Sequence, residues 1–597
     1  MNRVAAYLTP GRLLGWLVLL AVVLLYFVPV LMLVIGAFRD APPGTPGAWT
    51  IDGVVTAFSD PLTWQALGNS LWLALMMAIL STVVAAIMAT IAASRSPIAR
   101  LVTPVMVVAL AMPPLFFALS WDLLGTPGLG LVNGWLSHLT GWSGISVSGA
   151  WGTAFVGGIK VSTLVFFMLL TPFRAMDRRQ EEAAAVAGAG RLRVALTVRI
   201  PALLPALLGS FMIAFIIGLT AFDIPLIVGR PDGFYVFSTQ IYAALNDTSP
   251  PNYAVASALA MVLIAIVLIL VALRWLLLDR RSFTTLGGKA SDFAPEPTRA
   301  AAIGGGVFFG LFTLLVLVLP AAQMVLASFQ PAFGAGTLSM ANYNRVLRDP
   351  SIQSALGNTA LVAILGGALA VAIAFLLALV GRYGATAMRR TLDLATWLPW
   401  AANGVLLGLG LVWTFITISP LRDLFGTVWI VLIGLVVATT PLASRTIDGA
   451  LVQIGRELEE SGRVFGAGAT RVALGVVMRL MMPAMLAAWF ITAIHIVGNL
   501  EVPILLSLPT NRVMAVSVYQ YWGSGQGTSA AALFCLVIGA GILIGAVVAL
   551  VLFVVGRFLR VRRRRSPASR IEAAALAPRS GTGSAADAAL SMTSRRG

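Results

Sequence analysis

The sequence predicts an all-α integral membrane protein with about twelve transmembrane helices, arranged as two six-helix repeats of the same orientation. Three observations favour this fold class. Of the 597 residues, 59% are hydrophobic and only 11% are charged, a balance that excludes a soluble domain with a polar surface. Long apolar runs recur along the whole chain, with basic clusters beside them. Several short stretches of the first half also recur in the second.

The apolar runs are long enough to be membrane spans, because a helix needs about 20 such residues to cross a bilayer core. They begin near residues 13, 66, 101, 150, 202 and 253 in the first half, and near 302, 356, 392, 427, 483 and 530 in the second. The first run is too long for the core of a signal peptide and lacks a convincing cleavage site, so we interpret it as a retained span. Six spans are therefore expected in each half.

The charge pattern predicts the orientation of these spans. The formal net charge is +17, and the basic clusters flank the apolar runs instead of interleaving with aromatic residues, which favours a bilayer and not nucleic acid as the partner. If the N-terminus is cytoplasmic, most of the 40 Lys and Arg residues fall on the inner side. We therefore expect a multi-pass membrane protein with both termini in the cytoplasm.

The internal repeat is visible in three pairs of segments. DPLTWQALGNS at 60–70 matches DPSIQSALGNT at 349–359. EEAAAVAGAG, from residue 181, matches EESGRVFGAG, from residue 459, and FDIPLIVG, from 222, matches LEVPILLS, from 500. Because an even number of spans separates equivalent segments, the two copies are expected to be related by a pseudo-two-fold axis along the membrane normal. The Asn of the repeated GNS and GNT is interpreted as a helix N-cap.

These patterns predict the domain organisation. We expect a first domain at 1–278, a cytoplasmic linker at 279–301, a second domain at 302–556 and a basic, disordered cytoplasmic tail at 557–597. Each domain has a cytoplasmic loop between its fourth and fifth spans, at about 174–200 and about 450–480. The glutamates and alanines of the first loop favour a short helix, which the following glycines end.

Ionisable residues near or within the spans are candidates for a solute pathway, because charges at membrane depth are costly. Two acids stand at equivalent positions, each two residues before a proline that removes a backbone donor. Structural roles remain open alternatives for all of them. The candidates are Asp223, Pro225, Glu501, Pro503 and Lys160.

The first loop resembles the permease subunits of binding-protein-dependent ABC importers, whose cytoplasmic loop carries a Glu-Ala-Ala triplet, a nearby glycine and a later Ile-x-Leu-Pro end. The second copy departs from the pattern, with Ser461 and Gly462 at the alanine positions and Arg479 at the proline position. The residues that match in the first loop are Glu182, Ala183, Ala184, Gly188, Val198, Ile200 and Pro201, preceded by Glu181; those of the second loop are Glu459, Glu460 and Gly466.

The resemblance implies that each loop forms a coupling helix, which docks on a separate ATP-hydrolysing subunit. The implied partners are two ATP-binding subunits, as a homodimer, and an external solute-binding protein. The implied location is a bacterial inner membrane. No phosphate-binding Gly-Lys-Ser/Thr loop occurs in the sequence, so the chain itself is not expected to be an enzyme. With Cys535, His138 and His495 far apart, neither a metal site nor a cofactor is expected.

The fused arrangement resembles the iron(III) and thiamine importers. Iron(III) is the first choice of solute because of this layout and the paired acids; thiamine, polyamines and phosphonates are alternatives. An ion-coupled secondary transporter with parallel repeats is the main rival class, but such a protein needs no ATPase-docking loop. A membrane scaffold, the third class, would need neither a solute path nor paired acids.

Overall fold

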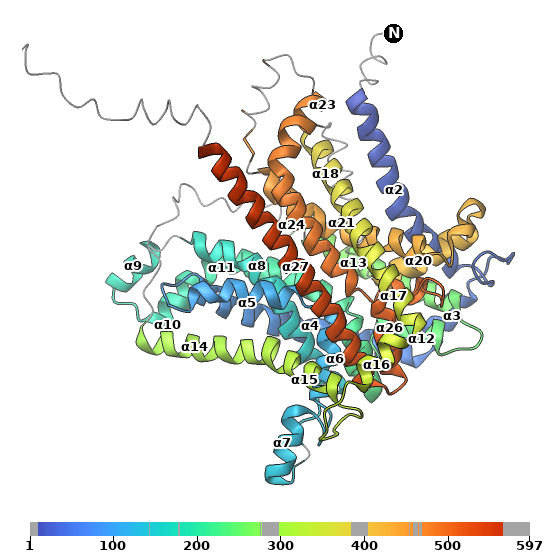
Figure 1. Cartoon of the computed structure of the whole chain (residues 1–597), viewed down its shortest axis with the longest axis horizontal. Coiled ribbons are helices and arrows are strands. Elements are labelled where there is room, and N and C mark those ends of the chain that lie inside the picture. Colours follow the sequence, from blue (N-terminus) through green and yellow to red (C-terminus); the bar gives the residue numbers. More distant parts are fainter. Residues whose placement is uncertain are drawn as a thin grey trace, which may run out of the picture. The chain divides into compact units, whose positions relative to one another are not determined.

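In the computed structural model, helices form nearly all the regular structure of the described residues (Figure 1). The structure describes residues 10–142, 144–176, 179–274, 276, 298–383, 404–452, 454–455, 457, 464 and 469–564. The chain divides into two compact units, Met1–Cys535 and Leu536–Gly597, and this boundary falls inside the last helix, α27 (Gly527–Arg564). The first unit carries the helices of both sequence halves up to the start of α27.

A helix occupies the place of each of the six runs expected in the first half. These helices are α2 (Pro10–Ala37), α4 (Pro61–Ala92), α5 (Ala99–Ala111) with α6 (Pro114–Leu124), α8 (Gly149–Ala175), α11 (Ile200–Leu219) and α13 (Tyr253–Arg274). Shorter helices lie between them: α3 (Asp52–Ser59), α7 (Leu131–Thr140), α9 (Arg179–Val186), α10 (Arg191–Val194) and α12 (Phe237–Asn246).

The second half follows the same order. Its long helices are α14 (Arg299–Thr313) with α15 (Leu319–Phe329), α17 (Pro350–Leu361) with α18 (Gly367–Tyr383), α20 (Gly404–Thr417), α21 (Val428–Val452), α24 (Met478–Val497) and α27. Its short helices are α16 (Ala341–Arg348), α23 (Ala469–Val472), α25 (Pro503–Leu506) and α26 (Met514–Gly523). Most of the run expected near residue 392 lies outside the described residues, and α20 follows it.

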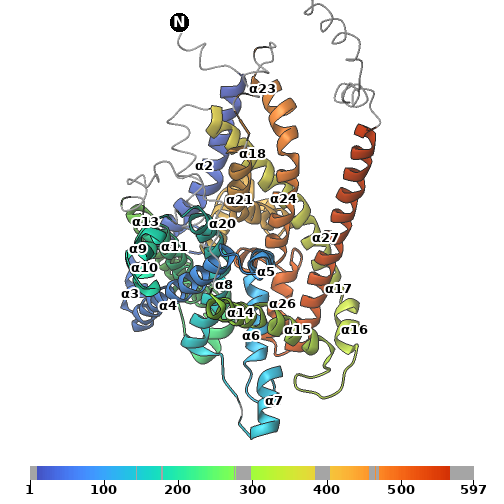
Figure 2. The ribbon, with the colours of Figure 1, turned by 90° about the vertical axis from the view of Figure 1, so that its left-hand side faces the viewer.

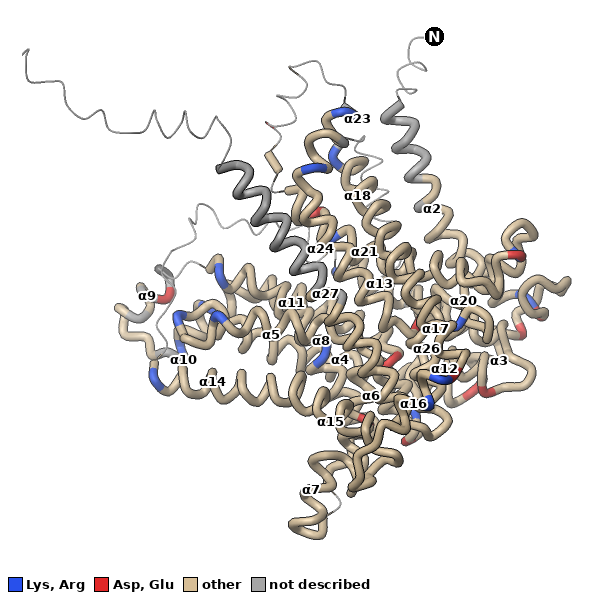
Figure 3. Tube along the Cα trace, viewed as in Figure 1, with Lys and Arg blue, Asp and Glu red and all other residues tan. Residues whose placement is uncertain are grey.

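Eight helices in the described part of the chain are long and apolar enough to cross a membrane. They are Pro61–Ala92, Gly149–Ala175, Ala195–Leu219, Tyr253–Arg274, Arg299–Phe329, Pro350–Arg382, Val428–Val452 and Gly475–Val497. The pair α5 and α6 makes a ninth if it forms one broken span. Shorter apolar helical stretches stand at the other three expected places, Leu24–Ala37, Gly404–Thr417 and Gly527–Leu543, so a total of twelve stays a prediction. Figure 3 shows charged residues mainly at helix ends and in loops.

The third expected span is not one straight helix. A bend of 93° separates α5 from α6. Met112 and Pro113 both have extended backbone conformations there, with ψ of 120° and 145°. The cause is the Pro113-Pro114 pair, because neither residue has an amide hydrogen to continue α5 and each disfavours a helical residue before it. The number of apolar residues in this run, on which the prediction of a span was based, does not reveal the break.

The interpretation of the GNS and GNT asparagines as N-caps is wrong. The caps are the aspartates that precede Pro61 and Pro350: the Asp60 side chain accepts a hydrogen bond from the Leu62 N–H at 2.9 Å, and Asp349 does the same for Ser351 at 2.9 Å. The asparagines lie farther on, within α4 and α17, where the intrahelical backbone bonds are already made. Their amides are therefore free to bind another segment.

In the first half, that segment is the start of α12. The Asn69 side-chain amide donates to the Tyr235 carbonyl at 2.8 Å, and the Ser70 hydroxyl accepts from the Phe237 N–H at 2.7 Å. A free amide at a helix N-terminus is satisfied in this way. The pair fixes the position of α12 against α4.

The second half has the same arrangement at the start of α26. The Asn358 amide donates to the Arg512 carbonyl at 3.0 Å, and the Thr359 hydroxyl accepts from the Met514 N–H at 2.8 Å. The repeated Gly-Asn-Ser/Thr sequence thus forms repeated tertiary contacts. We call these two sets of bonds the α12 clamp and the α26 clamp.

The packing of long helices also recurs. Helices α4, α8 and α11 pack together in the first half, as α18, α21 and α24 do in the second (Figures 1 and 2). Contacts between the halves are reciprocal: α2 packs on α20, and α15 packs on α6. In each case, the first span of one half meets the third span of the other. Reciprocal contacts of this kind are typical of units related by a two-fold axis.

Candidate functional site

The first candidate region is the segment between α8 and α11. Its acidic start forms the two-turn helix α9, which contains Glu182, Ala183 and Ala184. Gly188 follows with a φ of +84°, a left-handed conformation that favours glycine and suits the end of a helix. A short helix and a glycine turn therefore stand where the sequence predicts them.

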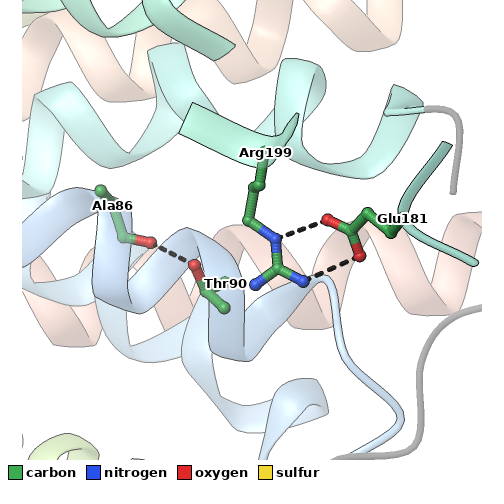
Figure 4. A network of polar contacts seen from close by, with 4 residues as sticks. All are labelled: Ala86, Thr90, Glu181 and Arg199. Carbon is green, nitrogen blue, oxygen red and sulfur yellow. Dashed lines mark hydrogen bonds and ion pairs between the residues drawn. The ribbon is translucent and has the colours of Figure 1, made fainter. Parts of the chain in front are cut away.

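An ion pair ties this short helix to the long one that follows. The Arg199 guanidinium donates to both carboxylate oxygens of Glu181, from Nε to Oε1 at 2.7 Å and from Nη2 to Oε2 at 2.9 Å (Figure 4). Arg199 belongs to a π-helical turn, Ala195–Arg199, that runs directly into α11. This bidentate ion pair fixes the orientation of the two side chains as well as the distance between them. It connects α9 with the base of α11.

The second candidate loop cannot be compared atom by atom, because Glu459, Glu460 and Gly466 lie outside the described residues. One difference is nevertheless visible in the sequence. The position equivalent to Arg199 is Val477, in the π-helical turn before α24. This apolar side chain cannot form the ion pair of the first loop.

Lys160 lies in the middle of α8 and is buried, with 7% of its surface exposed. Its ammonium group donates to the carbonyls of Ala109 at 2.7 Å and Leu110 at 3.4 Å, and also to Met112. In a continuous helix, the first two carbonyls would accept from the amides of residues 113 and 114, which are prolines. Lys160 thus supplies the donors that the bend between α5 and α6 lacks.

The two acids predicted from the repeat come close together across the two halves. Asp223 follows α11 and Glu501 follows α24, both beyond the apolar spans that end at Leu219 and Val497. Burial is the main cause that raises the pKa of the Asp223 carboxyl, and the nearby Glu501 charge raises it further. The pKa of Glu501 is also raised by burial. The two acids of the repeat therefore lie near enough for their charges to interact, and their role in a solute pathway stays a prediction.

The surroundings of the two acids differ. Asp223 is 4% exposed, and its Oδ1 has no hydrogen-bond partner among the described residues. Glu501 is partly exposed, and its Oε2 accepts from the Gly404 N–H at 3.1 Å, at the first described turn of α20. A hydrogen bond to the charged form stabilises a carboxylate. Glu501 is therefore the better stabilised anion.

Pro225 and Pro503 do not end the long helices. Helix α11 ends at Leu219 and α24 at Val497, before the acids, and each proline instead occupies the first position of a new helical turn. Proline is well suited to a first helical position, because its missing amide hydrogen would have no partner there. Glu501 lies in the turn that precedes α25, whereas Asp223 already belongs to the helical turn that continues into Pro225.

A pair of tyrosines at equivalent positions was not predicted from the sequence. Tyr242 of α12 meets Tyr519 of α26, with ring centroids 6.4 Å apart and an interplanar angle of 87°. A sequence signal for this pair exists, because VFSTQIY at 236–242 and VMAVSVY at 513–519 share the first and last residues.

Among the described residues, no group of three or more His, Cys, Asp or Glu side chains could hold a metal ion.

Comparison with known proteins finds a family match within the first half of the chain. Residues 81–282 match the model of the family described as binding-protein-dependent transport system inner membrane component. This match contains α8 to α13 and therefore the first loop and Asp223.

Three relatives of the chain are informative. A protein of Sinorhizobium fredii named "Probable ABC transporter permease protein y4fN" is 27% identical over 346 residues, 56% of this chain and 60% of that protein. The ferric transport system permease protein FbpB of Actinobacillus pleuropneumoniae is 24% identical over 538 residues, 85% of this chain and 74% of its own length. The putrescine transport system permease protein PotI of Escherichia coli is 27% identical over 292 residues, 47% of this chain and 95% of its own length.

Proposed function

We propose that this chain, which carries in residues 81–282 a domain of the binding-protein-dependent transport system inner membrane component family, is the fused membrane subunit of an ABC importer. In this role, it passes a small solute from an external binding protein through a path between its two halves. Two copies of a separate ATPase bind the loops between α8 and α11 and between α21 and α24 on the cytoplasmic side.

The observation that carries this proposal is the first loop. Its motif residues lie on α9, which a glycine turn and the Glu181–Arg199 ion pair connect to α11. A short helix fixed to a long one can transmit a movement of the ATPase to the membrane part without bending. No such lever is needed in a transporter driven by an ion gradient.

The fused, two-domain arrangement has independent support. The putrescine permease matches this chain over almost its own full length but covers only 47% of the chain, as one domain of two would. The α12 and α26 clamps recur at equivalent positions, and the contacts of α2 with α20 and of α15 with α6 are reciprocal. We infer a pseudo-two-fold axis along the membrane normal, with the solute path on it.

Iron(III) is the proposed solute. The ferric permease matches this chain over 85% of its length, which includes both halves. Asp223 and Glu501 lie close enough for their charges to interact; when ionised, they would attract a cation on the path and repel each other when none is bound. A polyamine is the second candidate, since a putrescine permease is among the relatives and the same acids suit an organic cation.

Co-expression with a candidate ATPase subunit tests the assignment. We expect a complex that hydrolyses ATP in proteoliposomes when the loaded binding protein is added, while the purified chain alone hydrolyses none. Uptake of radioactive iron(III) compared with labelled putrescine then distinguishes the two solutes. Robust hydrolysis by the isolated chain would contradict the proposal.

The acids are tested in the same system. The double variant Asp223→Asn with Glu501→Gln is expected to insert and to bind the ATPase normally, while solute uptake falls. The single variants provide the comparison, because each leaves one carboxylate on the path. Uptake by the double variant at the parental rate would show that the acids have a structural role only.

A further inference from the structure

Two tyrosines meet at the place where the halves of the chain meet. Tyr242 is on α12 and Tyr519 is on α26, and the edge of one ring faces the other at 6.4 Å. Each helix begins at its own clamp, made by Asn69 and Ser70 in one half and by Asn358 and Thr359 in the other. The two tyrosines therefore hold the same position in equivalent elements.

This contact locates the axis between the halves. When two units are related by a two-fold rotation, equivalent residues touch each other only beside the axis. Asp223 and Glu501 are a second equivalent pair that comes close together. The two pairs are adjacent, because Phe222, the neighbour of Asp223 in sequence, meets the Tyr242 ring with centroids 5.7 Å apart. A solute that moves along the axis has to pass both.

Each tyrosine is held in place by further contacts. The Arg230 guanidinium lies 5.7 Å from the centre of the Tyr242 ring, and it pairs with Asp247 at 2.6 Å. Tyr242 is 8% exposed, so the contact is closed to solvent on its side.

Tyr519 is connected to the first half of the chain through Trp522. Its ring lies 5.8 Å from that of Trp522, whose Nε1 donates to Oδ2 of Asp122 at 2.8 Å. Asp122 belongs to α6, in the first half of the chain. A movement of the halves away from each other would separate both Tyr519 from Tyr242 and Trp522 from Asp122.

We propose that the Tyr242–Tyr519 contact seals the solute path at the end marked by α12 and α26, and that it opens when the ATPase subunits close. The inference rests on the proposed function, which puts the path between the halves. Two tyrosine rings suit a seal, because their apolar faces exclude water while the hydroxyl groups accept it once the rings part.

Cross-linking in the complex with the ATPase tests the seal. The variant carries Tyr242→Cys and Tyr519→Cys together with Cys535→Ser, since Cys535 is the single cysteine of the sequence. A short bifunctional thiol reagent is applied without nucleotide and with ATP plus vanadate. We expect efficient cross-linking without nucleotide and a yield at least halved in the trapped state.

The matched control is a pair within one half. Trp72 and Phe234 have ring centroids 6.0 Å apart, and both lie in the first half, so Trp72→Cys with Phe234→Cys should cross-link equally in both states. A Tyr242–Tyr519 yield that stays constant in a complex that hydrolyses ATP overturns the seal but not the proposed function. If this chain binds no ATPase, both the proposed function and the seal lose their basis.

A second pair of variants needs no introduced cysteine. Tyr242→Phe with Tyr519→Phe retains both rings, whereas Tyr242→Ala with Tyr519→Ala removes them. Without nucleotide, we expect proteoliposomes with the alanine variant to leak a small cation faster than those with the phenylalanine variant. Equal leak rates, with both proteins folded by circular dichroism, would also overturn the seal.

Discussion

At the scale of single residues, Lys160 illustrates how a buried charge can have a structural role. Its ammonium group occupies the place of two missing amide donors at the end of α5, opposite Ala109 and Leu110. We expect Lys160→Met to destabilise the protein by roughly 1–3 kcal/mol, because buried carbonyls lose their partner. The measurement is the midpoint of thermal unfolding in detergent.

Two comparisons make this prediction specific. Arg100→Met, at an exposed position of α5, should leave the midpoint almost unchanged. Adding Pro113→Ala to Lys160→Met restores an amide hydrogen opposite Ala109 and should recover part of the loss. No recovery at all would argue for a role of Lys160 elsewhere.

The acid pair predicts how stability depends on pH. Burial raises the pKa values of Asp223 and Glu501 above their unfolded values, so the folded protein binds more protons than the unfolded chain between the two sets of values. Stability is then full below the unfolded pKa values and is lost as the pH rises through the folded ones. Asp223→Asn with Glu501→Gln should flatten the dependence of the unfolding midpoint on pH. A profile identical to that of the parent would contradict the shifted pKa values.

At the scale of elements, the Glu181–Arg199 ion pair predicts a difference between anchoring and coupling. The pair is partly exposed, with side-chain exposures of 14% and 34%, so its loss should cost at most about 1 kcal/mol of stability. Arg199→Gln should nevertheless reduce solute uptake per ATP hydrolysed, because α9 is no longer held against α11. The reversed pair, Glu181→Arg with Arg199→Glu, should restore part of the coupling. If Arg199→Gln leaves solute uptake per ATP hydrolysed unchanged, the ion pair is not needed to transmit movement from α9 to α11.

The two loops are expected to contribute unequally. Glu182→Ala and Gly188→Pro should uncouple ATP hydrolysis from uptake more strongly than Glu460→Ala, because only the first loop keeps the whole motif and its glycine turn at a φ of +84°. ATPase binding should survive both alanine changes. Equal loss of uptake per ATP at both loops would remove the asymmetry.

At the scale of the whole molecule, a chain with two loops in one polypeptide predicts a stoichiometry. One copy should bind two ATPase subunits, and native mass spectrometry of the complex measures the ratio directly. Because α2 packs on α20 and α15 packs on α6, each half supplies a partner for the other, and we expect one copy of this chain in the complex. A complex that contains two copies of this chain would contradict the fused arrangement.

The elements that depend on local patterns could be predicted from the order of residues alone. Apolar runs located the long helices, because a helix that crosses a bilayer core needs about 20 predominantly apolar residues. The repeated segments identified Asp223 and Glu501, and the first loop motif identified α9 and its glycine turn. Each of these inferences needs only the order and spacing of residues.

Contacts between residues that are distant in the sequence could not be predicted in this way. The Asn69 and Asn358 amides bind the starts of α12 and α26, Lys160 fills the break after α5, and Tyr242 lies against Tyr519. The physical reason is that hydrogen bonds and ring contacts depend on positions in space, which spacing along the chain does not fix. The bend after α5 shows the same limit, because the prolines signal a break but only the packed structure shows its angle of 93° and the donor that stabilises it.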